Sequence, residues 1–307
     1  MSDNSPVLKV RDLTVDFSMY DRGWKKRELE VLHSLDVEVG RGEIVAVAGS
    51  SGSGKSVLAH CIMGILPENA SARGSILYMG EELSGIRARL LKNGDITFIP
   101  QSVDFLDPLM KAGEQIKGVR GSEEKAADVM RRCGLEEDVK DKYPFQLSGG
   151  MARRVLIASA LSGEPKLIIA DEPTPGLEAS LAEEMLKGFR RIADTGCAVL
   201  LITHDIDTAV RVADRVAVFY AGTTVEVCPA SDFVSGRDTL RHPYTKALVD
   251  AMPQNDFIAI EGRQPYAGAL PEGCLFGDRC SLRTEECRGY MEMRDLRGGK
   301  VRCLHAT

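Results

Sequence analysis

Three glycines within six residues, followed by a lysine and a serine, are the feature that most constrains this chain. The stretch reads Gly49-Ser50-Ser51-Gly52-Ser53-Gly54-Lys55-Ser56. A β-branched apolar run, 43–48, precedes it, and apolar residues at helical spacing follow from Val57 to Ile65. Glycines let backbone N–H groups approach an anion, and the first turn of a helix carries a positive partial charge. The order of strand, glycine-rich loop and helix therefore predicts a loop that binds the phosphates of a nucleoside triphosphate.

The residues around this loop have distinct expected roles. Lys55 is expected to reach the β- and γ-phosphates, and the hydroxyl of Ser56 is expected to bind Mg²⁺. Phe17 ends a segment, 7–17, that alternates as an edge strand does and is expected to pair with 31–39; its ring could stack on the base or pack in the core. The predicted ATP-binding residues are Gly49, Ser50, Ser51, Gly52, Ser53, Gly54, Lys55, Ser56, Val57 and Phe17.

Two later segments are almost wholly apolar and end in polar residues. Residues 167–170 are followed by Asp171 and Glu172, and residues 198–203 are followed by His204. Such uniform runs are typical of central strands in a parallel sheet that helices cover on both faces. Ligands of these sheets collect beyond the carboxyl ends of the strands, so we expect the three polar residues to lie beside the phosphate loop.

This arrangement assigns a role to each polar residue. Asp171 is expected to orient Mg²⁺ through water, opposite Ser56. Glu172 is expected to act as the general base that polarises the attacking water. His204 is expected to hydrogen-bond the γ-phosphate or that water, and Gln101, which ends a predicted strand, to complete the shell of Mg²⁺ and water.

Composition narrows the possible partners. The net charge is −6 and the pI is near 5.5, so nucleic acid is not an expected partner. No apolar run approaches the roughly 20 residues needed to span a bilayer. The first residues are polar and give no sign of a signal peptide. Any work at a membrane is therefore expected to depend on other chains.

One more motif, Leu147-Ser148-Gly149-Gly150-Met151, opens a predicted helix downstream of the phosphate loop. With that loop, Gln101, the Asp171-Glu172 pair and His204, it makes a set of motifs that resembles the ATP-binding cassette (ABC) family over residues 7–253. The resemblance implies an ATPase with an α/β P-loop NTPase fold that has a parallel core sheet and an antiparallel β subdomain.

The resemblance also implies how such a domain is organised. A helical subdomain is expected at about 102–160, within an ABC ATPase domain of residues 1–253. Two cassettes of the family pack head to tail, so residues 147–151 of one chain close over ATP held by the other. Ser148 and the two glycines after it begin a helix and can offer N–H groups to the γ-phosphate.

Within the family, the chain looks most like the ATP-binding subunits of oligopeptide, dipeptide and nickel importers. The local evidence is Met151 in place of a commoner Gln, the segment 241–248, and the tail 270–280. The resemblance implies a second ABC ATPase subunit in a heterodimer, two membrane-spanning permeases that contact residues 103–110, and an extracellular substrate-binding protein. It places the chain at the cytoplasmic face of the cell membrane, and leaves open whether the cargo is peptide, nickel or a metal chelate.

Two positions depart from the family pattern. Glu178 stands where the family generally has an Asp that communicates across the dimer, which puts symmetric coupling of the two ATP sites in question. Arg153 and Arg154 follow the signature where Arg-Gln-Arg is more usual, and we expect them to face acidic neighbours.

A cysteine-rich extension, 254–307, forms the last part of the chain. Four other cysteines are scattered through apolar surroundings and are expected in the core. The tail is loop-rich and short, so a metal centre could staple it. The resemblance favours a 4Fe–4S cluster, with Zn²⁺ (which could also use His305) or unliganded thiols as alternatives. The expected ligands are Cys274, Cys280, Cys287 and Cys303.

Two functions of other classes remain open at this point. One is a soluble ABC ATPase that acts on ribosomes or DNA without a transporter, although the chain has one cassette and no basic patch. The other is an iron–sulfur regulatory protein that binds ATP only as a ligand. The regulatory-protein interpretation predicts that Glu172→Gln leaves function intact, whereas the importer interpretation predicts that it abolishes turnover while ATP still binds.

Overall fold

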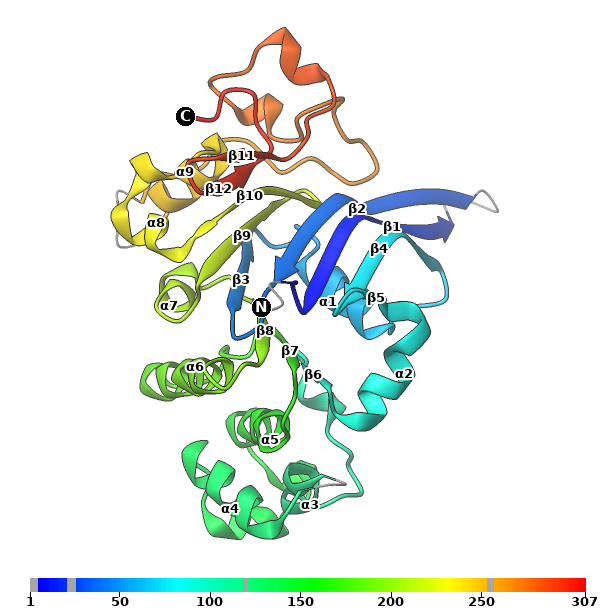
Figure 1. The fold of residues 1–307 in the computed structure, drawn as a ribbon, viewed down its shortest axis with the longest axis vertical. Helices are drawn as coiled ribbons and strands as arrows, with labels where there is room; N and C mark the ends of the chain where they lie inside the picture. Colours follow the sequence, from blue (N-terminus) through cyan, green and yellow to red (C-terminus); the bar gives the residue numbers. More distant parts are fainter. Residues whose placement is uncertain (1–4, 21–25, 119–120, 253–254, 256) are drawn as a thin grey trace.

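The computed structural model describes residues 5–20, 26–118, 121–252, 255 and 257–307, which form two β-sheets surrounded by helices (Figure 1). The larger sheet has eight strands and the smaller sheet has four. Two hydrophobic clusters fill the two faces of the larger sheet. Within the described ranges, no helix is both long enough and apolar enough to cross a membrane.

The larger sheet has a parallel centre and an antiparallel end. β9, β3, β8, β7 and β6 are parallel neighbours in that order, and β10 and β12 extend the sheet in antiparallel fashion beyond β9. The strands in spatial order are β11 (Arg294–Leu296), β12 (Gly299–Val301), β10 (Thr223–Pro229), β9 (Arg215–Tyr220), β3 (Ile44–Gly49), β8 (Ala198–Ile202), β7 (Leu167–Asp171) and β6 (Ile96–Ile99).

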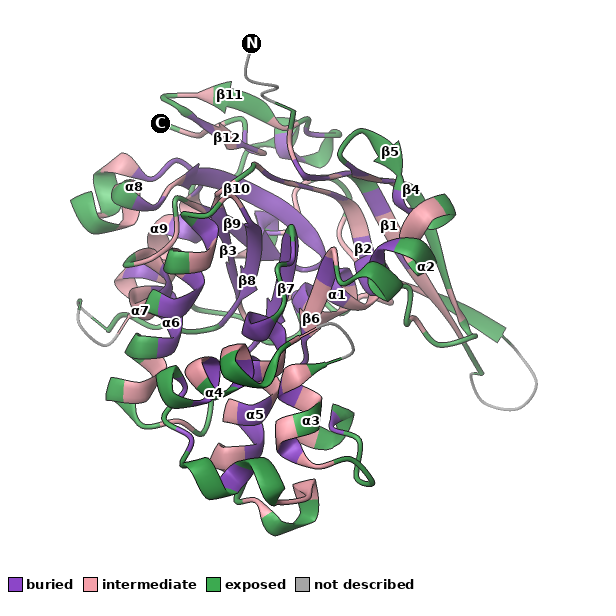
Figure 2. Cartoon of the chain, turned by 60° about the horizontal axis from the view of Figure 1, so that its bottom comes forward, coloured by how far each residue is buried: buried purple, intermediate pink, exposed green. Residues whose placement is uncertain are grey.

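The central strands are buried along their whole length, as their uniform apolar runs predict. Alternate side chains of β3 enter different clusters: Ile44 and Ala46 belong to one, and Val45 and Val47 to the other. Because both faces of the sheet are covered (Figure 2), the positions of these strands before Asp171 at the end of β7 are apolar or glycine. The predicted parallel core is confirmed.

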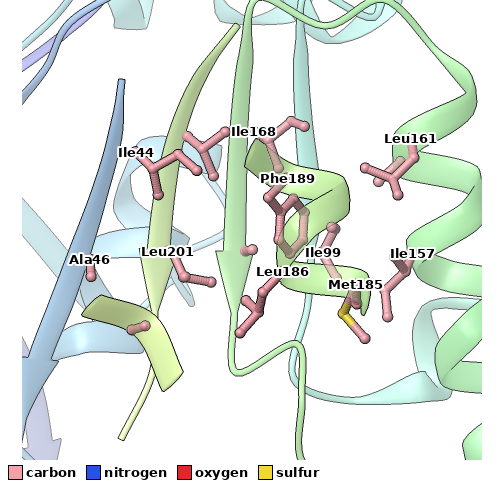
Figure 3. Packing of buried hydrophobic residues seen from close by; sticks show 14 of the residues in the cluster. Ile44, Ala46, Ile99, Ile157, Leu161, Ile168, Met185, Leu186, Phe189 and Leu201 are labelled. Atoms are coloured by element: carbon pink, nitrogen blue, oxygen red, sulfur yellow. The ribbon is translucent and has the colours of Figure 1, made fainter. Parts of the chain in front are cut away.

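Helices α5 (Gly149–Ser162) and α6 (Ala179–Ala193) pack over one face of the sheet. Figure 3 shows Phe189 and Leu186 of α6 beside strand residues such as Ile168. A short helix, α7 (Ile206–Val210), completes this layer. On the opposite face lie α1 (Lys55–Met63), α2 (Leu83–Asn93) and the smaller sheet.

The smaller sheet corrects one prediction. Its order is β2 (Lys26–Val39), β1 (Leu8–Tyr20), β4 (Ala70–Tyr78) and β5 (Glu81–Glu82), so β1 is an internal strand and not an edge strand. The pairing of β1 with β2 is antiparallel, as expected. The edge prediction rested on alternation of apolar and polar residues, which also occurs in an internal antiparallel strand with one face in the core. Asp12, at φ 48°, lies in a register break of both pairings of β1.

A helical subdomain lies between β6 and β7 in the sequence. Its helices pack against α5, and its buried residues belong to the same cluster as the sheet. The subdomain ends with α5 at Ser162, close to the expected 102–160. Its other elements are α3 (Ala112–Lys117), α4 (Glu123–Arg132) and the 3₁₀ turns Val103–Phe105, Glu137–Asp141 and Pro144–Gln146.

The C-terminal extension is joined to the larger sheet. β12 pairs with β10 through Glu226 and Val301, so the extension completes the sheet and does not stand apart as a loop-rich tail. In Figure 1 it lies, orange to red, at the end of the molecule beyond β10. The remaining elements of this half are α8 (Ala230–Ser235), α9 (Pro243–Asp250) and the 3₁₀ turns Arg237–Thr239, Gly277–Arg279 and Glu285–Arg288.

A buried arginine holds this junction together. Arg241 and Glu226 are 2% and 0% exposed, and the Arg241 Nη1 atom lies 3.2 Å from the Glu226 carboxylate and 2.7 Å from that of Asp232. The Arg241 guanidinium also donates to the carbonyl oxygens of Leu296 and Arg297, which flank the β11–β12 turn. One side chain therefore connects β10, α8 and the final hairpin.

Replacing Arg241 with Met is expected to lower the free energy of unfolding by about 3–5 kcal/mol, because the carboxylate of Glu226 is left buried without its cation. Arg237→Met is the matched control, since Arg237 forms an exposed pair with Asp250 and its loss should cost less than about 1 kcal/mol. Urea denaturation of both variants measures the difference. Equal losses of unfolding free energy in the two variants would show that the buried pair stabilises the fold no more than the exposed pair does.

Candidate functional site

The three strands β3, β8 and β7 are neighbours in the sheet, so their carboxyl ends meet at one edge. β3 ends at the phosphate loop, β7 ends at Asp171, and β8 ends two residues before His204. The predicted convergence of these polar groups is therefore present in the fold. Two hydrogen bonds cross between the three strand ends, and each is described below.

The glycines of the phosphate loop occupy positions that other residues could not. Gly49 has a φ of 156°, and a Cβ there would lie 2.3 Å from the carbonyl oxygen of Phe219. Gly54 has a φ of 92°, and its Cβ would lie 2.2 Å from the Leu32 side chain. The loop thus depends on glycine both for its backbone conformation and for close packing.

Lys55 begins α1 and turns back over the loop. Its Nζ donates to the carbonyl oxygens of Gly49, at 2.8 Å, and Ser50, at 3.1 Å. Burial lowers the pKa of Lys55, although the charges of Glu172 and Asp171 act to raise it. The ammonium group is therefore held at the phosphate loop beside two carboxylates.

Ser56 and Asp171 form the first of the bonds between strand ends. The Ser56 hydroxyl donates to Asp171 Oδ1 at 3.2 Å, across from β7. Asp171 is 1% exposed, and burial raises the pKa of its carboxyl group more than the Ser56 hydrogen bond and the Lys55 charge lower it. A buried carboxylate beside a hydroxyl offers the oxygen ligands that Mg²⁺ prefers, so these two residues fit the expected cation.

Glu172 and His204 form the second bond. His204 Nδ1 lies 2.7 Å from Glu172 Oε2, while the imidazole remains largely exposed. Glu172 has a φ of 49°, and its N–H donates to the carbonyl oxygen of Ile202. This left-handed turn directs the Glu172 carboxylate to the end of β8, where it meets His204.

Arg153, near the start of α5, is a site residue whose role the sequence did not reveal. Its guanidinium donates to the carbonyl oxygens of Pro100 at 2.8 Å, Gln101 at 2.6 Å and Glu172 at 2.7 Å. Arg153 is buried and its hydrogen bonds among the described residues go to backbone oxygens, while the charges of Glu172 and Asp171 act to raise its pKa against the effect of burial, as expected of acidic neighbours. It therefore ties α5 to the ends of β6 and β7. A helical arginine next to the signature was the only available signal.

The remaining predicted ATP-site residues have varied surroundings. Gln101 lies two residues beyond the end of β6. It is exposed, and its side chain makes no hydrogen bond among the described residues. Ser53 is fully buried, and its hydroxyl has no partner among the described residues. Val57 and Phe17 are partly buried against the cluster between the two sheets. Base stacking by Phe17 stays a prediction, as do the roles of Ser51 and Gly52.

The signature segment, Leu147 to Met151, lies at the start of α5. The Ser148 hydroxyl accepts the N–H of Met151 at 3.3 Å and so caps the helix. Ser148 and Gly149 are exposed, and within the described part of the chain no hydrogen bond connects the segment to the phosphate loop. Glu178, at the N-terminus of α6, is exposed as well and makes no capping hydrogen bond.

The cysteines divide as their surroundings predict. Cys61, Cys133, Cys197 and Cys228 are buried in the core. In the extension, Cys287 and Cys303 are buried and Cys274 and Cys280 are partly buried, and burial raises the pKa of Cys274 to about 11. Nevertheless, the described residues contain no group of three or more metal-binding side chains arranged to hold an ion. The expected 4Fe–4S cluster or zinc site therefore finds no support in this geometry.

Arg153→Lys is expected to lower the free energy of unfolding by about 1–3 kcal/mol, because one ammonium group cannot reach three diverging carbonyl oxygens and leaves at least one of them unpaired in the interior. The matched control is Arg154→Lys, since Arg154 bonds the carbonyl oxygens of Gly150 and Gly134 at a more exposed position. Urea denaturation compares the two. A loss that is equal in both variants would remove Arg153 as a specific anchor.

Comparison with known proteins identifies the family. Residues 32–175 match the family described as "ABC transporter", and residues 225–287 match the family described as "Oligopeptide/dipeptide transporter, C-terminal region". The "Probable D,D-dipeptide transport ATP-binding protein DdpD" of Escherichia coli (strain K12) is 33% identical over 97% of this chain and 95% of its own length. The "Oligopeptide transport ATP-binding protein OppD" of Mycobacterium tuberculosis is 33% identical over 92% of this chain, which spans 49% of that relative.

Solved structures agree. The dimeric post-hydrolysis state of the ATP-binding cassette MJ0796 bound to ADP and Pi matches with a TM-score of 0.62 and 25% identity, over 73% of this chain and 98% of that one. The predicted α/β P-loop fold and ATPase activity are confirmed, and the comparisons favour neither the transporter-independent ATPase nor the iron–sulfur regulator. The chain therefore belongs to the ABC transporter ATP-binding proteins that carry the oligopeptide/dipeptide transporter C-terminal region.

Proposed function

We propose that this chain is the ATP-binding and ATP-hydrolysing subunit that powers an ABC importer of dipeptides or oligopeptides. The observation that carries the proposal is the meeting of two polar pairs, Ser56 with Asp171 and Glu172 with His204, at one edge of the larger sheet. Lys55 lies at the same edge. Together these groups provide an anion cradle, a cation site and a base within one neighbourhood.

The proposed chemistry assigns each group a step. Backbone N–H groups of the phosphate loop and the Lys55 ammonium bind the phosphates of ATP. Ser56, Asp171 and Gln101 would hold Mg²⁺, which would neutralise charge on the phosphate oxygens. Glu172 accepts a proton from a water molecule while the water oxygen bonds to the γ-phosphorus. The bond from that phosphorus to the bridging oxygen breaks, and ADP leaves with the electron pair.

His204 acts in this scheme as the group that orients the base. Its bond to the Glu172 carboxylate fixes the direction of one carboxylate oxygen, which leaves the other available to water. The exposed position of the His204 ring also allows it to approach the γ-phosphate. Arg153 also helps to fix the position of Glu172, because its guanidinium donates a hydrogen bond to the Glu172 carbonyl oxygen.

A complete site needs a second cassette. Ser148 and Gly149, at the N-terminus of α5, are exposed, and within the described residues no hydrogen bond connects them to this chain's own phosphate loop. We therefore propose head-to-tail pairing with another ABC ATPase subunit, in which 147–151 closes over the partner's ATP. A heterodimer would accommodate the unusual Glu178 at one of two unequal sites.

The cargo and the further partners are proposed from the relatives. Their names describe dipeptide and oligopeptide transport, whereas nickel or metal-chelate cargo stays a prediction from the sequence motifs alone. The proposed assembly has two transmembrane permeases and an extracellular substrate-binding protein. This chain would be peripheral, at the cytoplasmic face of the membrane, and held there by the permeases.

Residues 103–110 are the proposed contact with a permease. Phe105, Leu109 and Met110 are 57%, 87% and 42% exposed, so three large apolar side chains lie uncovered within a short segment. The segment directly follows Gln101, whose backbone is held by Arg153. Movement of a bound permease would therefore be transmitted to the strand end that contributes to the Mg²⁺ shell.

The proposed function does not depend on a metal centre in the extension. A 4Fe–4S cluster or a zinc ion at Cys274, Cys280, Cys287 and Cys303 stays a prediction from the sequence, and it would require these thiols to move into a common coordination shell. The extension contributes instead through its pairing with β10 and its contacts with Arg241.

Glu172→Gln is expected to reduce ATP turnover by about 10²–10⁴-fold while ATP still binds, because the general base is lost and the phosphate cradle is kept. Lys55→Ala is expected to lose ATP binding itself. Phosphate release and equilibrium ATP binding, measured on both variants of the full chain, separate the two effects. Normal turnover in Glu172→Gln would refute the proposed base.

Leu109→Glu is expected to prevent association with the permeases, because it places a charge in an apolar contact. Tagged Glu172→Gln protein is purified from detergent-solubilised membranes of the native host with ATP and Mg²⁺, with and without the second change. Two polytopic permeases should copurify only when Leu109 is present, whereas a second cassette that pairs through residues 147–151 should be recovered in both cases. Val234→Glu is the control, since Val234 is a 74% exposed apolar residue on α8. Recovery of soluble proteins alone would refute the transporter assignment.

A further inference from the structure

The C-terminal extension reaches the phosphate loop. Ser50 Oγ donates to Gln264 Oε1 at 2.7 Å, and Gln264 Nε2 donates to the carbonyl oxygen of Gly52 at 3.1 Å. A single amide group therefore holds two points of the loop, although Gln264 lies more than two hundred residues downstream. Neither the phosphate-loop motif nor the expected site residues included it.

We infer that Gln264 is a positioning residue of the nucleotide site, which it serves by fixing the outer side of the phosphate loop. The inference rests on the proposed nucleotide site at Lys55 and Ser56. It makes the C-terminal extension a part of the ATPase active site, and not only an addition to the sheet.

The hydrogen-bond partners of Gln264 indicate that it positions the phosphate loop and does not compete with a phosphate for the same groups. Gln264 binds a hydroxyl and a carbonyl oxygen, whereas phosphate oxygens are bound by N–H groups and by the Lys55 ammonium. The carbonyl oxygens of Gly49 and Ser50 are likewise held by Lys55. The carbonyl oxygens of Gly49, Ser50 and Gly52 thus accept hydrogen bonds from Lys55 or Gln264. Without these donors, the oxygens would repel a phosphate.

A second anchor from the same half of the chain supports this arrangement. The Ser50 N–H donates to the hydroxyl oxygen of Tyr244 at 3.3 Å, and Tyr244 is buried on α9. The Tyr244 ring lies 4.5 Å from that of Tyr220 and 5.4 Å from that of Phe276, centroid to centroid. Ser50 is therefore held on its backbone by α9 and on its side chain by Gln264.

Arg279 fixes the segment that carries Gln264. Its Nε donates to the carbonyl oxygen of Glu261 at 2.7 Å, and its Nη2 donates to that of Ile260 at 3.0 Å. The same guanidinium donates to the Tyr220 hydroxyl at 3.1 Å and lies over the Tyr220 and Phe276 rings. Because Gln264 is three residues beyond Glu261, this anchor limits where its amide can lie.

The expected benefit is preorganisation. A loop with three glycines samples many backbone conformations, and binding a phosphate requires it to adopt one of them. Two hydrogen bonds from Gln264 restrict residues 50–52 before ATP arrives. Removing them should weaken ATP binding without affecting the groups that perform hydrolysis.

The test uses Gln264→Ala in the full chain. Equilibrium binding of Mg²⁺–ATP, measured in the Glu172→Gln background so that ATP persists, is expected to weaken about three- to tenfold, which corresponds to the loss of one or two net hydrogen bonds. In the chain with Glu172 intact, KM for ATP should rise by the same factor while kcat stays unchanged. Ser50→Ala should weaken binding as well. Because Ser50 and Gln264 share one hydrogen bond, the double variant should lose less binding free energy than the sum of the losses in the two single variants.

Tyr266→Ala is the matched control. Tyr266 lies on the same segment, but it packs on Arg27 of β2 and not on the phosphate loop. Its removal should leave ATP affinity unchanged. Unchanged or tighter binding by Gln264→Ala, or an equal loss in both variants, would overturn the inference. Failure of the proposed nucleotide site is distinguishable, because Lys55→Ala would then bind ATP normally.

Discussion

Lys55, Arg153, Asp171 and Glu172 are buried at one edge of an apolar sheet, and the desolvation of these four charged residues is the constraint on which the site depends. A buried charge is stable only when opposite charges or hydrogen bonds compensate it. Here the two cations and the two carboxylates are mutually compensating, and burial still lowers the pKa of Lys55 and raises that of Asp171. Desolvation therefore outweighs the compensating charges at Lys55 and at Asp171.

Much of this edge was predictable because it is local in sequence. The apolar runs of β3, β7 and β8 each end in polar residues, and parallel pairing brings those ends together without any further information. Arg153 was not predictable in the same way. Its role comes from three carbonyl oxygens on two other segments, and no spacing in the sequence specifies which backbone atoms a helical arginine will meet. The register break that makes β1 internal is equally non-local.

The extension shows the same limit more strongly. Four cysteines in a short segment suggested a metal centre. The sequence did not reveal that β12 pairs with β10 or that Arg241 holds the β11–β12 turn. These contacts supply order that a short loop-rich segment would otherwise need from a ligand. The extension can therefore hold its four cysteines, two of them buried and two partly buried, without a coordination shell among the described residues.

The contacts of Gln264 give this docking a functional meaning. A phosphate loop needs glycine for close approach to the anion, and the same glycines make it conformationally free. β3 fixes the start of the loop and α1 fixes its end. The residues between them therefore need support from elsewhere. Tyr244 and Gln264 supply that support from the C-terminal half, and Arg279 joins both to the aromatic cluster. A change that displaces Gln264 therefore acts on the phosphate loop at Ser50 and Gly52, which its amide contacts, and on neither Asp171 nor Glu172 directly.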